Sequence, residues 1–92
     1  MSLDKTVVEK INEVCYILWD FSIKNRVHIS IETDIVLFRG IIFTMKMPSL
    51  DSEVNRVINM TCVQRLTPVI VYKMFNDMLK ELKIRTENIQ ND

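Results

Sequence analysis

Residues 35–47 (IVLFRGIIFTMKM) are apolar on both faces when they are read as an extended strand. Successive side chains of a strand point to opposite faces of its sheet. One face then carries Ile35, Leu37, Ile41, Phe43, Met45 and Met47, and the other carries Val36, Phe38 and Ile42. Such a segment needs apolar cover on both sides, so either the helices of the chain enclose it or a partner covers one face.

Gly40, the only glycine of the chain, lies within this segment. It predicts either a bulge in one long strand or, together with Arg39, a turn that produces a three-stranded meander. We favour the long strand, because the turn would leave a middle strand of about four residues, which is shorter than usual. A single glycine also excludes the glycine-rich loops that cradle phosphate groups.

The first third of the chain predicts a helix followed by a strand. Residues 4–25 carry apolar side chains at helical spacing, with Tyr16 and Trp19 at the flanks of the apolar stripe. Residues 27–32 alternate between apolar and polar side chains, which is typical of a strand with one buried face. A tight turn at Thr33 and Asp34 would join this strand to the next.

Two helices are expected in the second half. Leu50, Val54, Val57 and Ile58 recur at helical spacing and predict a helix within residues 50–65. Thr67 is a good N-cap and Pro68 suits a first helical position, so a last helix begins there. Residues 87–92 are polar and are expected to form a frayed end.

These elements predict one small α+β domain over residues 1–92. The expected order is α-β-β-α-α, with an antiparallel β-hairpin packed on helices. A two-stranded ribbon is barely stable alone, so its second face needs cover. Two arrangements stay open: the helices cover both faces within one chain, or dimerisation extends the sheet.

Composition argues against several chemistries. The chain has 92 residues, a formal net charge of zero, two cysteines and one histidine. Two cysteines and one histidine are too few for a four-ligand structural zinc site, and no cofactor motif is present, so we expect neither metal nor cofactor. His28 has no sequence signature that places it beside a nucleophile, so we expect a protein that is not an enzyme. No apolar run approaches membrane length and no signal peptide is recognisable, which favours a cytoplasmic protein.

The two-faced segment leads to the functional hypothesis. We expect a small interaction or regulatory protein, such as an adaptor, inhibitor or accessory subunit, that forms a homodimer or binds another protein. The residues expected at the interface are Val36, Phe38, Ile41, Ile42, Phe43 and Met45.

Nucleic-acid binding is the alternative hypothesis. A local basic patch suffices for phosphate contacts even in a neutral chain. The residues expected to form it are Lys24, Arg26, Arg39 and Lys46. Acidic residues are interleaved throughout the sequence and no recognised nucleic-acid motif is present, so we rank this alternative second.

Overall fold

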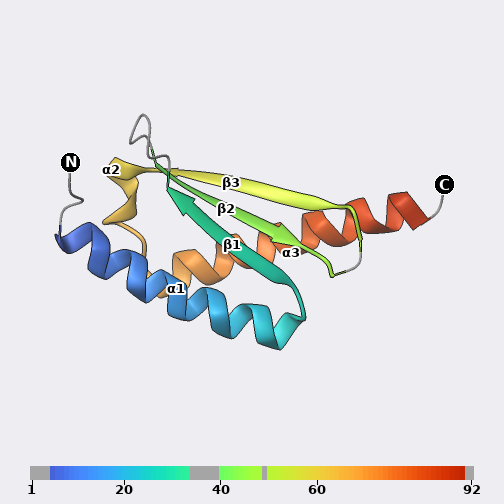
Figure 1. The fold of residues 1–92 in the computed structure, drawn as a ribbon, viewed down its shortest axis with the longest axis horizontal. Helices are drawn as coiled ribbons and strands as arrows, with labels where there is room; N and C mark the ends of the chain where they lie inside the picture. Colours follow the sequence, from blue (N-terminus) through green and yellow to red (C-terminus); the bar gives the residue numbers. More distant parts are fainter. Residues whose placement is uncertain (1–4, 34–39, 49, 91–92) are drawn as a thin grey trace.

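The described part of the chain forms a three-stranded antiparallel sheet, two long helices and one short helix (Figure 1). The computed structural model describes residues 5–33, 40–48 and 50–90. The α+β class is confirmed, and the element order is α-β-β-β-α-α, with one strand more than expected. The elements are α1 (Lys5–Asn25), β1 (His28–Thr33), β2 (Gly40–Lys46), β3 (Glu53–Asn59), α2 (Met60–Val63) and α3 (Pro68–Gln90).

Local capping chemistry sets the ends of the two long helices. After α1, Arg26 adopts a left-handed conformation with φ of 55°, and the Val27 N–H donates to the Ser22 carbonyl at 3.2 Å, which satisfies a carbonyl of the last turn. At the start of α3, the Thr67 hydroxyl accepts a hydrogen bond from the Ile70 N–H at 3.3 Å, which confirms the expected N-cap. A frayed end is expected at residues 87–92; of these, residues 87–90 are helical as the last turn of α3, and residues 91 and 92 lie outside the described residues.

The hairpin of β1 and β2 differs from the expected one in its connection. Thr33 pairs with Ile41 and Glu32 with Ile42, so the connection holds more than two residues. The tight turn expected at Thr33 and Asp34 is therefore wrong, since Thr33 belongs to β1. β2 begins at Gly40 and ends at Lys46, and most of the remainder of the expected long strand, residues 35–39, lies outside the described residues.

Gly40 is explained by a close approach of β3. The pairing of β2 with β3 runs without interruption from Gly40 to Lys46, so Gly40 forms no bulge. A Cβ atom at Gly40 would lie 2.2 Å from the carbonyl oxygen of Ile58 and 2.9 Å from its carbon. Only a residue without a side chain fits against this backbone, and the glycine thereby permits the end of β3 to lie beside the start of β2.

The segment at residues 53–59 is strand β3, so the helix expected within residues 50–65 is wrong. Only the four residues of α2 are helical there. Val54 is fully buried and Ile58 is half-buried, while Val57 between them is exposed on the other face of the sheet. Pairing with β2 along seven residues stabilises the extended form over the helical one.

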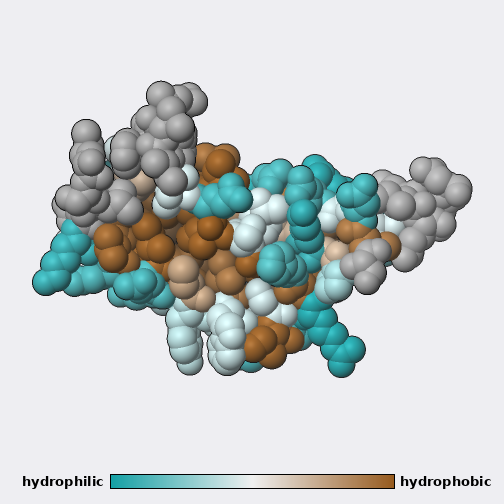
Figure 2. Space-filling model, viewed as in Figure 1, coloured by the Kyte–Doolittle hydropathy of each residue, from teal (hydrophilic) through white to brown (hydrophobic). Residues whose placement is uncertain are grey.

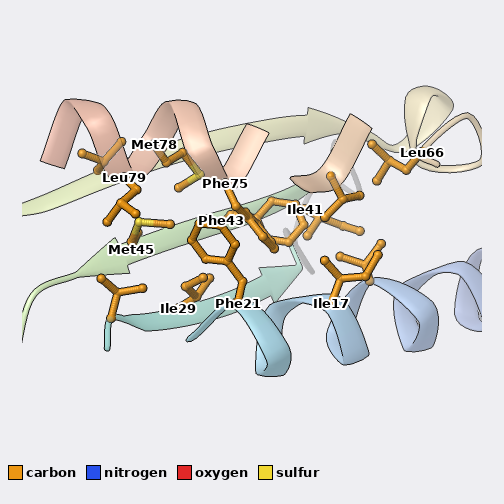
Figure 3. Packing of buried hydrophobic residues seen from close by; sticks show 14 of the residues in the cluster. Ile17, Phe21, Ile29, Ile41, Phe43, Met45, Leu66, Phe75, Met78 and Leu79 are labelled. Carbon is orange, nitrogen blue, oxygen red and sulfur yellow. The ribbon is translucent and has the colours of Figure 1, made fainter. Parts of the chain in front are cut away.

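Both long helices pack on the same face of the sheet, and the core lies between these two layers (Figure 3). Phe75 of α3 lies at its centre, with its ring centroid 5.5 Å from that of Phe21 and 5.6 Å from that of Phe43. The helices therefore cover one sheet face and leave the other uncovered by any described helix. The core residues of the sheet are Ile29, Ile41, Phe43, Met45 and Val54, and those of the long helices are Val7, Val14, Ile17, Phe21, Val71, Phe75, Met78, Leu79 and Leu82.

Candidate interaction surface

Three of the six residues expected at the interface are core residues. Ile41, Phe43 and Met45 expose 1%, 0% and 0% of their surface. They point towards the helices, so a partner does not reach them in this fold, and their assignment to an interface is corrected. Ile42 is half-buried on the opposite face of the sheet, as the alternation of the segment predicts. Val36 and Phe38 lie outside the described residues.

The uncovered face of the sheet is mostly polar in its described part. Its apolar contribution comes from the paired residues Ile42 and Val57, and Val57 is 61% exposed. Beside them the Thr44 hydroxyl donates to the Asn55 side-chain oxygen at 2.7 Å. Lys46 and Glu53, which are partners at the end of the same two strands, form an ion pair at 3.7 Å. This face is therefore stabilised by its own polar pairs and offers one small apolar spot.

A larger apolar surface lies on α1. Tyr16, Trp19, Ile23 and Val8 are 71%, 60%, 58% and 40% exposed. At 3.6 residues per turn these four positions fall within an arc of about 80° on the helix. We call them the α1 stripe. Figure 2 shows pale and brown side chains projecting along the lower edge of the molecule, where the second half of α1 runs in Figure 1.

The α1 stripe is separate from the face by which α1 joins the core. Val7, Val14, Ile17 and Phe21 form that inner face and are each at most 6% exposed. A surface helix normally needs one apolar face for folding, so a second one calls for another explanation. The sequence does indicate this second apolar face, because residues 16, 19 and 23 follow helical spacing among themselves. The sequence reasoning missed it by treating Tyr16 and Trp19 as flanks of the core face.

The two aromatic side chains of the α1 stripe contact each other on the surface. The ring centroids of Tyr16 and Trp19 are 6.5 Å apart and the ring planes are tilted by 39°. This separation is within the range of favourable aromatic pairs, and Trp and Tyr are enriched among the residues that dominate the binding energy of protein interfaces. The pair therefore places two large aromatic rings side by side on the exposed face of α1.

A polar cluster borders the α1 stripe on the side of α3. The Tyr72 hydroxyl donates to the Asp20 carboxylate at 2.9 Å, and the Lys24 ammonium lies 3.1 Å from the same oxygen. The hydrogen bonds from Lys24 and Tyr72 lower the pKa of Asp20, and the carboxylate in turn raises the pKa of both partners. The cluster ties α1 to α3 and gives the apolar stripe a charged rim.

The residues expected to contact nucleic acid are only partly brought together. Lys24 and Arg26 lie at the end of α1, and Lys46 lies at the same end of the sheet because it pairs with His28. Lys24 is paired with Asp20 and Lys46 with Glu53, so two of the three cations are already neutralised. Arg26 is exposed and has the conformational role of ending α1. Arg39 lies outside the described residues.

A second ionic cluster joins β3 to α3. Glu81 accepts hydrogen bonds from Arg56 and from Arg85, the latter at 2.8 Å, and Arg85 also donates to the Glu53 backbone carbonyl at 2.7 Å. The hydrogen bond from Arg56 is the main reason why the pKa of Glu81 is lowered. Each of these cations has a partner within the chain, so the cluster stabilises the packing of β3.

The described residues carry few other features that could form a chemical site. They contain no group of three His, Cys, Asp or Glu side chains arranged to hold a metal ion. Cys15 is half-buried, Cys62 is exposed, and both are unbonded. No helix within residues 5–33, 40–48 and 50–90 combines the length and apolar character needed to cross a bilayer.

No protein-family model, curated protein or solved structure matches the chain.

Proposed function

We propose that the chain is a non-enzymatic protein–protein interaction module of the adaptor, inhibitor or accessory-subunit kind, and that it binds through the α1 stripe. The observation that carries this proposal is the exposure of Trp19 and Tyr16 on a face of α1 that the core does not use. The proposal keeps the function expected from the sequence and moves its surface from the strand to the helix.

The energy available from the α1 stripe suits an interaction surface. Burying the exposed parts of the two aromatic side chains, roughly 100–170 Å2 each, contributes about 5–8 kcal/mol at about 25 cal/mol per Å2. Association costs about 4–15 kcal/mol in lost freedom. The rings alone therefore support weak binding, and a tighter complex needs the aliphatic members of the stripe and its polar rim as well.

A protein partner is favoured over nucleic acid by the local charges. Phosphate groups would have to compete with Asp20 for Lys24 and with Glu53 for Lys46. The α1 stripe itself is apolar and aromatic at its centre with charges at its edge, which is the usual composition of a protein interface.

Site-specific photo-crosslinking tests the proposal. Benzoylphenylalanine in place of Tyr16 keeps an aromatic group within the stripe, and the same residue in place of Ile84, an apolar residue of α3 that is 59% exposed, is the matched control. We expect protein adducts, with a second copy or with another protein, from position 16 and not from position 84. Adducts with nucleic acid, or no adduct of position 16 with any protein in the native cell, would contradict the proposal.

A further inference from the structure

We infer that a second copy of this chain occupies the α1 stripe, with the two α1 helices packed antiparallel about a two-fold axis close to Tyr16. The inference rests on the proposed function and names the partner. It depends on three properties of α1: the order of residues along the stripe, the charges beside it and its length.

The order of residues makes the stripe complementary to itself. In an antiparallel pair with the axis near Tyr16, Val8 lies opposite Ile23 of the second copy, and Ile23 lies opposite Val8 of the second copy. Trp19 then lies opposite Asn12, a short exposed side chain that leaves room for the indole, and Tyr16 lies beside its own counterpart. Each large exposed side chain therefore meets a smaller side chain or its own equivalent.

The charges beside the stripe form pairs of both signs in this alignment: Lys5 lies opposite Arg26 of the second copy, two exposed cations that repel each other, while the flank towards α3 carries charges of opposite sign. Glu9 and Lys24 lie on the flank that faces α3, and a two-fold axis brings that flank of one copy against the same flank of the other. Close to this register Glu9 lies near Lys24 of the second copy, but the Lys24 ammonium is 3.1 Å from Asp20 of its own chain, so the two carboxylates share it and each symmetric pair adds only a weak attraction. Glu13 lies opposite Asp20, but Lys10 neutralises Glu13 at 3.2 Å and Lys24 neutralises Asp20 at 3.1 Å within each chain.

The length and area of α1 match a small dimer interface. A helix of 21 residues is about 31 Å long, so the two stripes overlap along most of their length. The four residues of the stripe expose roughly half of the about 800 Å2 per partner that a standard interface buries. Asn12, Glu9 and Lys24 are exposed beside them and supply part of the rest. We therefore expect a dimer that dissociates on dilution.

The first measurement is the mass of the full chain by light scattering during gel filtration over a range of concentrations. We expect a dimer at high concentration, a monomer after Trp19→Gln or Ile23→Gln, and an unchanged dimer after the control Ile84→Gln, with circular dichroism confirming that each variant is folded. A monomer for the native chain at every concentration would overturn the inference. A dimer that survives Trp19→Gln and Ile23→Gln but is lost after Val57→Lys would also overturn it and place the contact on the sheet.

The second measurement tests the antiparallel register. In a background with Cys15→Ser and Cys62→Ser, Val8→Cys and Ile23→Cys variants are oxidised separately and as an equimolar mixture. We expect disulfide-linked dimers mainly in the mixture, because Val8 of one copy faces Ile23 of the other. Equal crosslinking of either variant alone would overturn this arrangement. If the chain is a monomer while benzoylphenylalanine at position 16 still crosslinks to a different protein, this inference fails and the proposed function stands.

Discussion

The two apolar faces of α1 differ in what covers them. Val7, Val14, Ile17 and Phe21 are buried against the sheet and α3, whereas Tyr16, Trp19 and Ile23 on the other face are 58–71% exposed. Both sets follow helical spacing, so both favour the helix equally in the sequence. The pattern of apolar residues therefore predicts a helix, while the arrangement of the other elements decides which face of the helix the chain itself covers.

The largest difference between the two faces of α1 is expected in the free energy of unfolding, when a side chain is truncated on the core side or in the α1 stripe. Phe75→Ala removes a fully buried ring that packs on Phe21 and Phe43, and we expect it to lower the free energy of unfolding by about 3–5 kcal/mol. Trp19→Ala should change the same free energy of the dilute protein by less than about 0.5 kcal/mol. Urea unfolding followed by circular dichroism measures both. A comparable loss in the two variants would show that the α1 stripe belongs to the fold.

The fold could be predicted from the sequence where local signals agree with tertiary packing. The boundary at Thr67 and Pro68, the length of α1 and the alternation of β1 were all predicted, because capping residues and periodicity act locally. β3 was missed for a specific reason. Its inward positions are Val54, Arg56 and Ile58, so a charged residue interrupts the alternation, while the outward Val57 completes a helical spacing.

The charged residue within β3 can face inward because α3 provides its partner. Arg56 reaches Glu81, which is 22 positions beyond the end of β3 in the sequence. No local pattern reveals such a pair, and the same holds for the α1 stripe, whose exposure depends on where α3 and the sheet lie. The α+β class was therefore predictable, while the third strand and the candidate surface needed the structure.

Gly40→Ala tests the close backbone contact between the start of β2 and the end of β3. The added methyl group would meet the Ile58 carbonyl, which is backbone and moves only with the strand. We expect the free energy of unfolding to fall by about 1–3 kcal/mol, as for other overpacked sites. Equal stability of Gly40→Ala and the native chain in thermal unfolding would argue against this contact.

Arg26→Gly tests the left-handed residue that ends α1. Arg26 has φ of 55°, a conformation that costs a side-chain-bearing residue more than glycine. We expect Arg26→Gly to raise the free energy of unfolding by about 0.5–1 kcal/mol. The control Arg26→Ala removes the charge and keeps the strain, so it should not stabilise. Thermal unfolding at a fixed concentration compares the three chains.

The smallest effect is expected from acid and concerns the carboxylates of the two polar clusters, Asp20 and Glu81. Hydrogen bonds from Lys24 and Tyr72 lower the pKa of Asp20, and those from Arg56 and Arg85 lower that of Glu81. A folded-state pKa below the unfolded value contributes stability at neutral pH that is lost as the pH falls from about 4 through the lowered values. Asp20→Asn and Glu81→Gln should therefore each flatten the fall in unfolding midpoint on acidification.

The two substitutions should differ in their second readout. Asp20 borders the α1 stripe, so Asp20→Asn should shift the concentration at which the proposed dimer dissociates, whereas Glu81 joins β3 to α3 on another side of the molecule. Light scattering on both variants at neutral pH measures this difference. An equal shift of the dissociation concentration in both variants would mean that the carboxylates act only through the stability of the fold. The polar rim of the α1 stripe would then make no separate contribution to binding.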